Sequence, residues 1–296
     1  MSNEIKSGLK GGILQGVKSG LGMSNMVSGL KSGIVEKLPD KNKMQNPLNL
    51  SGNKKPLIYC NADNITTNTG IVITLTDLIG SGFTLTNAQG TSFTPDLIVK
   101  DIFNRRDSLD FNNGGCSLYP TPALNFNGKS EVSIMMVCKL KSIAAQVFYI
   151  QDSTTPGGVD LSTTDTNRTL RSIYYGGQAG AMTNSQYDSF LSQNESSDWM
   201  ILTCKYRLKQ PGGAGSEQEM YVNGRLQHKF ISSNFNIITT TMTSAQTFII
   251  GNTSTTSGSR GNSMYLGSFL LLDYWMNESE QLRLENYFRW YYGNKF

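Results

Sequence analysis

At 296 residues, the chain can form one large all-β domain with an appendage or two domains, and only 16% of its residues are charged. Residues 1–55 hold nine lysines and three acidic residues (+6), while the remainder holds 17 basic and 19 acidic residues (−2). Lysines without arginine or interleaved aromatic residues do not indicate a specific nucleic-acid site. Ser, Thr, Asn and Gly are abundant, as in proteins built from strands and turns.

Several other classes of protein are also disfavoured. The N-terminus lacks the continuous apolar stretch of a secretory leader, and no run of 18 apolar residues predicts a transmembrane helix. His228 is the only histidine and none of the four cysteines forms a C-x-x-C pair, so neither a zinc cluster nor a Ser-His-Asp system is expected. Cys138 and Cys204 fall in predicted core strands, where we expect free thiols.

Residues 1–55 are predicted to be a docking arm and linker. A glycine followed by an aliphatic residue recurs every four positions, which places small residues roughly on one helical face where two backbones can approach closely. Eight glycines between residues 8 and 33 disfavour a stable helix of the arm alone in water. The candidate docking residues are Gly8, Leu9, Gly12, Ile13, Gly16, Val17, Gly20, Leu21, Gly29, Leu30, Gly33 and Ile34.

Three interpretations of the arm stay open. It is a disordered tail, an extended or helical element that folds on a partner, or an amphipathic segment at a membrane. We favour the second, and expect an acidic protein surface or copies of this chain as partners. The arm lacks an aromatic anchor, which argues against membrane contact. Pro39 ends the periodic part and a polar linker follows it. The stretch to Pro56 is expected to be extended and to run over a surface.

Residues 56–296 are predicted to form one two-sheet sandwich, because short alternating strands are separated by Gly, Asn, Asp and Pro turns. Residues 133–140 form a near-continuous apolar run, as expected for a strand buried on both faces. Residues 199–206 are expected to pair with 219–222, and Asn223-Gly224 predicts a tight turn because both residues tolerate φ > 0. The other expected strands are residues 71–75, 146–150, 247–252 and 265–272.

The chain ends in a predicted helix over residues 278–293. Apolar residues recur at 284, 287, 288 and 291, acidic residues occupy the first turn, and Gly293 marks the end. Asn277 is the expected N-cap. Trp199 and Trp290 are both expected in the core.

The order of several motifs resembles a known family. These are L-I-Y-C-N-A-D at 57–63, an imperfect D-x-S-G-x-G turn near 77–82, segments 95–104 and 108–114, Y-V-N-G at 221–224, I-G-N at 250–252 and L-E-N-Y-F-x-x-Y-Y-G at 284–293. Together they resemble the laminin-G-like, concanavalin-A-like jelly-roll domains of bacterial surface proteins and many phage virion proteins. The resemblance spans residues 56–296 and implies an all-β, two-sheet concanavalin-A-like jelly-roll sandwich with a C-terminal helix and a Gly-rich N-terminal arm.

Glycosidases of this fold resemble one another in carrying E-x-D-x-x-E on one strand, and this sequence lacks that motif. Glu217 and Glu219 come nearest, and their position next to a Gly-rich loop predicts a solvated hairpin rim without catalytic burial. We therefore expect no enzymatic activity and no cofactor.

Two kinds of ligand are considered for the head. Asp152, Asp160 and Asp165 are expected in a polar loop and offer oxygen ligands that suit Ca²⁺, but their spacing fits no defined calcium loop. Sugar binding needs an exposed aromatic ring among polar groups. Tyr174, Tyr175 and Tyr187, in a region expected to be rich in loops, are the candidates for carbohydrate contact.

The sequence thus predicts a non-enzymatic structural protein of a virus particle, a capsid-decorating, tail or fibre-base module assembled in the host cytoplasm. Its arm would dock into other virion proteins and into copies of itself. The alternative is a carbohydrate-binding adhesin or receptor-binding protein that uses loops at one edge of the sandwich. An enzyme that cleaves polysaccharides is disfavoured because the carboxylate motif is missing.

Overall fold

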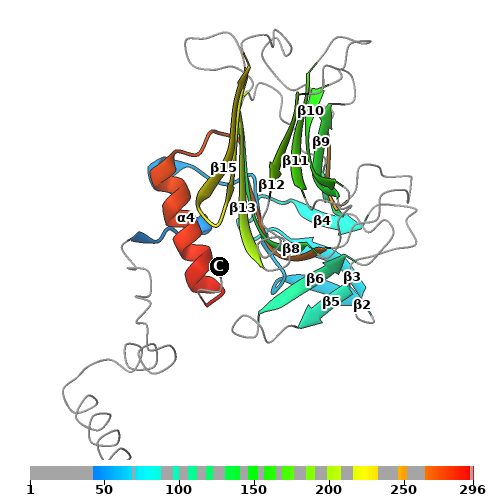
Figure 1. Cartoon of the computed structure of the whole chain (residues 1–296). Coiled ribbons are helices and arrows are strands. Elements are labelled where there is room, and N and C mark those ends of the chain that lie inside the picture. Colours follow the sequence, from blue (N-terminus) through cyan, green and yellow to red (C-terminus); the bar gives the residue numbers. More distant parts are fainter. Residues whose placement is uncertain are drawn as a thin grey trace, which may run out of the picture. The chain divides into compact units, whose positions relative to one another are not determined.

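The computed structural model (Figure 1) describes residues 43–68, 71–87, 96–99, 106–111, 118–122, 131–140, 146–152, 157–164, 169–176, 185–190, 199–207, 216–232, 246–251, 264–293 and 296. All twelve candidate docking residues between Gly8 and Ile34 lie outside these ranges, so the arm's role stays a prediction. Residues from Met44 to Phe296 form one compact unit.

The strands form two antiparallel sheets, as expected for an all-β sandwich. The first, called the helix-covered sheet, runs β1 (Ile58–Asn61), β17 (Met264–Leu272), β8 (Glu131–Leu140), β13 (Met200–Arg207), β14 (Ser216–Val222) and β15 (Arg225–Ser232).

The second sheet runs in the order β12 (Ser185–Phe190), β11 (Thr169–Gly176), β10 (Gly157–Thr164), β9 (Gln146–Asp152), β16 (Gln246–Ile250), β7 (Leu118–Thr121), β4 (Thr84–Asn87) and β3 (Ile71–Thr76). Strand β3 also pairs with β2 (Ile65–Asn68) and β5 (Asp96–Val99). The two sheets are joined because β5 pairs with β6 (Asp107–Phe111), which in turn pairs with β17.

Strand β8 confirms the prediction of a strand buried on both faces. Ile134 and Met136 face the core between the sheets, whereas Met135 and Val137 face a second core beneath the C-terminal helix. Successive side chains of a strand point to opposite faces, so a strand with two buried faces needs an unbroken apolar run. The expected strands at 71–75, 146–150, 199–206, 219–222, 247–252 and 265–272 all correspond to observed strands.

The C-terminal helix, α4 (Glu278–Tyr291), also forms as predicted. The side chain of Asn277 accepts a hydrogen bond from the backbone N–H of Glu280 at 2.9 Å, and Gly293 follows the helix with φ = 75°. Leu284 and Phe288 are fully buried against the helix-covered sheet, and each contributes about 1.5–3 kcal/mol by burial.

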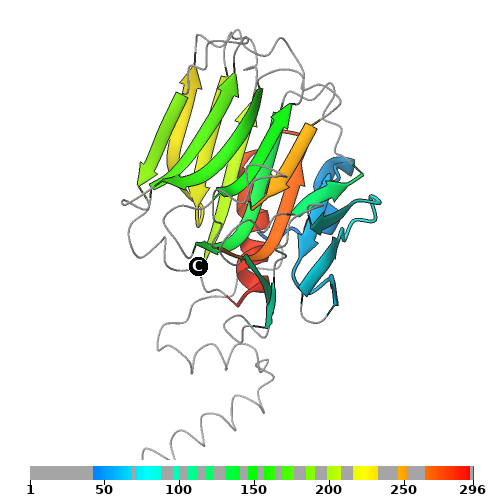
Figure 2. The same cartoon turned by 90° about the vertical axis from the view of Figure 1, so that its right-hand side faces the viewer.

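Helix α4 covers the face of its sheet that is turned away from β9, β10 and β11 (Figure 1). Figure 2, turned by 90°, shows the strands in front and α4 behind them. The helix-covered sheet is therefore the middle layer of this part of the molecule. None of the helices described in the structure is long and apolar enough to cross a membrane.

The two tryptophans predicted to be in the core differ. Trp199 is 3% exposed and stacks on Tyr265 with ring centroids 6.1 Å apart, which confirms its prediction. Trp290 is 42% exposed, so its prediction is wrong. The helix turns Leu284 and Phe288 to the sheet, and position 290 falls on the opposite, solvent-facing side.

Residues 44–55 run over the surface of the domain, as predicted, but they are not extended throughout. They include two short 3₁₀ helices, η2 (Pro47–Asn49) and η3 (Ser51–Asn53). The backbone N–H of Gln45 donates to the carbonyl of Arg283 at 3.1 Å, Leu50 is buried in the core beneath α4, and Lys54 pairs with Glu280 at 3.3 Å. We call residues 44–55 the strap, because they hold one side of α4.

Candidate functional site

The three tyrosines predicted to contact carbohydrate lie in strands, not in the loops that we expected. Tyr174 and Tyr175 belong to β11 and Tyr187 belongs to β12, and the two strands pair with Tyr187 opposite Ser172. Their side chains lie outside what the structure describes, so the proposed sugar contact stays a prediction.

The aspartates considered for Ca²⁺ do not share one loop either. Asp152 is the last residue of β9, Asp160 lies within β10, and Asp165 is outside the described residues. Within the described ranges, no group of three or more His, Cys, Asp or Glu residues is placed to hold a metal ion. Cys60, Cys138 and Cys204 are buried free thiols, as predicted for the last two. Burial raises the pKa of Cys138 to about 12.

Glu217 and Glu219 are buried, so the prediction of a solvated rim is wrong. Both carboxylates lie on the face of β14 that is turned toward α4. They belong to an ion-pair cluster that spans four neighbouring strands. The register places Lys205 opposite Glu219 and Arg207 opposite Glu217. The cluster consists of Glu131, Lys205, Arg207, Glu217, Glu219 and Lys229.

Short contacts connect this cluster throughout. The Lys205 Nζ lies 2.6 Å from a carboxylate oxygen of Glu219, and Lys229 lies 2.7 Å from both Glu217 and Glu219. The Tyr221 hydroxyl donates to Glu219 at 2.8 Å. Arg207 lies 3.3 Å from Glu217, and its guanidinium lies 4.3 Å from the ring centroid of Trp275. Three cations therefore balance three carboxylates.

The charge of Glu219 is stabilised by this arrangement. Burial alone would raise its pKa, but hydrogen bonds from Lys205, Lys229 and Tyr221 outweigh burial and lower the pKa. A glycosidase needs one of its two carboxyl groups to stay protonated as the general acid near neutral pH. The lowered pKa of Glu219 and its ion pairs instead suit a structural role.

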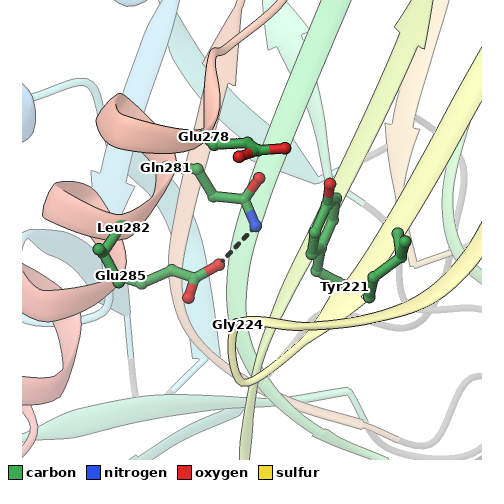
Figure 3. Close-up of a pocket in the computed structure, with 7 residues that line it drawn as sticks. Tyr221, Gly224, Glu278, Gln281, Leu282 and Glu285 are labelled. Atoms are coloured by element: carbon green, nitrogen blue, oxygen red, sulfur yellow. Dashed lines mark hydrogen bonds between the residues drawn. The ribbon is translucent and has the colours of Figure 1, made fainter.

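Next to the cluster, α4 and the hairpin of β14 and β15 enclose a pocket of about 300 Å³. Figure 3 shows Glu278, Gln281 and Glu285 projecting from α4 toward Tyr221 and the turn at Gly224. Helical residues at i, i+3, i+4 and i+7 share one face, which explains why these side chains line the same wall. The full lining is Tyr221, Gly224, Leu226, Glu278, Gln281, Leu282 and Glu285.

Hydrogen-bond acceptors dominate the inner wall of the pocket. Glu285 accepts hydrogen bonds from Gln281 Nε2 at 2.9 Å and from the hydroxyl of Thr203 at 3.3 Å. Burial raises the pKa of Glu285. The hydrogen bonds from Gln281 and Thr203 lower it, as do the positive charges of Arg289 and Lys205, but together they offset the effect of burial only in part. The other polar atom of Gln281, Oε1, is buried without a hydrogen-bond partner.

The outer rim of the pocket is apolar. Leu226 on β15 and Leu282 on α4 are both exposed to solvent and flank the opening. Gly224 lets the turn approach Glu285 closely, because a Cβ at this position would lie 2.6 Å from Glu285 Oε2. Its φ of 82° also favours glycine in this tight turn. The Asn223-Gly224 turn is as predicted, with Asn223 at φ = 53°.

This pocket was not predicted, although the sequence contains two signals of it. One is the acidic and amide stripe of Glu278, Gln281 and Glu285, which follows helical spacing beside the apolar stripe. The other is the predicted tight turn, which places a glycine where a neighbouring element can approach closely. What the sequence does not show is that the helix packs beside this turn.

Comparisons with known proteins bear on the fold. No family model matches the chain, and no curated protein does. Its structure is similar to the botulinum neurotoxin serotype D binding domain, with a TM-score of 0.50 and 9% identity over 77% of this chain and 50% of that chain. A mutant of HCR D/C is similar with a TM-score of 0.51 and 13% identity over 78% of this chain and 51% of that chain.

The chain thus spans about half the length of the solved structures that it matches. At these identities the likeness shows the fold, an all-β sandwich of the jelly-roll kind, and no more. The more specific resemblance to laminin-G-like domains and the place in a virion stay predictions.

Proposed function

We propose that the sandwich is a non-enzymatic carbohydrate-binding module and that the pocket between α4 and the β14–β15 hairpin holds the sugar. The observation that carries this proposal is the pocket's composition. Sugars present hydroxyl donors around an apolar ring, and the pocket pairs the acceptors of Glu278, Gln281 and Glu285 with the apolar Leu226 and Leu282. These two leucines take the place of the exposed aromatic ring that we expected from the sequence, since Tyr221, the aromatic residue of the lining, is 9% exposed.

The size of the pocket and the fold support the same proposal. A volume of about 300 Å³ is at the lower end of the range for small-molecule sites, so one or two sugar units fit better than a folded peptide. The fold is shared with structures named as binding domains, which is compatible with recognition but leaves the ligand open. We therefore favour the adhesin alternative over a purely structural role for the head.

Binding is tested by screening the full chain on immobilised saccharides and measuring the strongest hit by calorimetry. Leu282→Ala removes an apolar group from the pocket rim, and we expect the dissociation constant to rise about fivefold, the loss of roughly 1 kcal/mol. Leu48→Ala removes a similarly exposed leucine on the strap and serves as the matched control. Equal affinity of the two variants would place the sugar outside this pocket.

We further propose that the domain does not hydrolyse the saccharides that it binds. The ion pairs of Glu217 and Glu219 support this, because a general acid with a lowered pKa is deprotonated at neutral pH. Incubation with a bound oligosaccharide is expected to release no reducing ends. Release that Glu219→Gln abolishes, while the variant stays folded, would show that the pair is catalytic.

Residues 1–42 are proposed to attach this module to neighbouring subunits of a virus particle, on the strength of their glycine spacing and lysine content. Deleting residues 1–42 should leave the melting temperature unchanged and abolish incorporation into the particle. Deleting residues 1–55 should also lower the free energy of unfolding, by about 1.5–3 kcal/mol for the burial of Leu50 alone. Incorporation of the chain that lacks residues 1–42 would contradict the docking role of the arm. Equal stability of the two truncated chains would contradict the stabilising role of the strap.

A further inference from the structure

The pocket between α4 and the β14–β15 hairpin contains more negative charge than its surroundings balance. Glu278 and Glu285 both line it, and neither forms an ion pair with a cation in the part of the chain that the structure describes. By contrast, the three carboxylates of the adjacent ion-pair cluster are all paired. The pocket therefore differs from this cluster in having carboxylates without a paired cation.

The two cations that lower the pKa of Glu285 both have other partners. Arg289 directs its donors to the carbonyl of Asn223 at 2.6 Å and to the carbonyl of Phe296 at 2.9 Å. The Lys205 Nζ lies 2.6 Å from Glu219. Both contribute charge at a distance, but the pKa of Glu285 stays raised by burial, which indicates that its charge is incompletely compensated.

A second and independent observation is the unpartnered amide oxygen of Gln281. The residue is 4% exposed, its Nε2 is used by Glu285, and its Oε1 has no hydrogen-bond partner. Leaving a buried acceptor unpaired costs about 1–3 kcal/mol, so such an atom in a pocket wall indicates a missing donor. Figure 3 shows the Gln281 amide lying between the carboxylates of Glu278 and Glu285 and directed toward Tyr221.

We propose that the ligand of this pocket is a sugar that carries a free, protonated amine, an inference that rests on the proposed carbohydrate-binding function. An ammonium group has three N–H donors and a positive charge, which match Gln281 Oε1 and the carboxylates of Glu278 and Glu285. The ring's C–H groups would contact Leu226 and Leu282. A sugar that carries a carboxylate is disfavoured, because like charges in a partly buried site repel.

The test compares three trisaccharides with the same linkage that differ only at one ring position, where they carry an amine, an acetamide or a hydroxyl group. Calorimetry with the full chain, below the pKa of the sugar amine, should give about tenfold tighter binding of the amino sugar, because charge-assisted hydrogen bonds are about twice as strong as neutral ones. Added salt should reduce that preference.

Variants locate the preference in the pocket. Glu285→Gln keeps the shape of the side chain and removes its charge, and the amino sugar should then bind no more than about threefold tighter than the neutral sugar. Leu48→Ala should keep the full preference.

The outcomes separate the two proposals. Equal binding of all three sugars, or a preference that persists in Glu285→Gln, would overturn the amine inference while the carbohydrate-binding function stands. If no sugar binds, the proposed function fails as well. If a lysine-containing peptide binds in place of the sugars, the pocket recognises an amine without the sugar, and both proposals are wrong.

Discussion

Replacing Lys205 by alanine is expected to lower the free energy of unfolding by about 3 kcal/mol, at the lower end of the range for breaking a buried ion pair. The Lys205 side chain is 1% exposed and lies 2.6 Å from Glu219, which the substitution would leave buried with less compensation. Lys229 and Tyr221 still contact Glu219, which is why we expect the lower end. Chemical denaturation monitored by tryptophan fluorescence measures the change.

Lys229→Ala is the matched control, because Lys229 contacts the same carboxylate at 2.7 Å but is 42% exposed. Exposed pairs contribute only about 0–1 kcal/mol, so this variant should be nearly as stable as the parent. Equal losses of unfolding free energy in the two variants would show that the burial of Lys205 does not make its ion pair more stabilising than the exposed one.

The same pair gives the sign of one pH effect. The pKa of Glu219 is lower in the folded domain than its ordinary value, so the stabilisation that Glu219 provides is present above its unfolded-state pKa. This stabilisation is lost as the pH falls through the folded-state pKa. The Lys205→Ala variant should therefore lose less stability on acidification than the parent.

Trp199→Ala is expected to cost about 3–5 kcal/mol, the usual loss for a large aromatic side chain deleted from a core. Trp199 precedes β13, is buried beneath α4 and stacks on Tyr265. Its removal leaves a cavity where the helix, β13 and β17 meet, and the surrounding backbone is held by the sheet and cannot collapse into it. Denaturant unfolding at equilibrium gives the value directly.

Trp290→Ala removes the same side chain from an exposed position and should cost less than about 1 kcal/mol. The contrast between the two tryptophans tests how α4 is rotated on its sheet. Similar losses at both positions would mean that the helix face assigned to solvent is in fact buried.

The elements predicted best are those whose local pattern and burial agree. Strand β8 has an unbroken apolar run because both of its faces are covered. Helix α4 is capped at its start by the side chain of Asn277, and Gly293 follows its end with a positive φ. Short strands such as β7 were missed, since four residues that include Pro120 give no periodic signal.

The candidate site was harder to predict because it depends on packing between distant segments. The residue type and local sequence of Glu217 and Glu219 predict exposure to solvent. Their burial follows from the register that places Arg207 and Lys205 opposite them. The pairing of these two strands was predicted. The opposite charges at every second position of both strands therefore could have predicted these ion pairs from the sequence. No sequence pattern indicated that the turn at Gly224 would meet Glu285.

The most direct test of the account is a crystal structure of the full chain with the tightest-binding saccharide. We predict electron density for the sugar between α4 and the β14–β15 hairpin, with a donor within hydrogen-bond distance of Gln281 Oε1 and of Glu285. Density for the sugar over β11 and β12, near Tyr174 and Tyr187, with the pocket empty at saturating ligand, would contradict it.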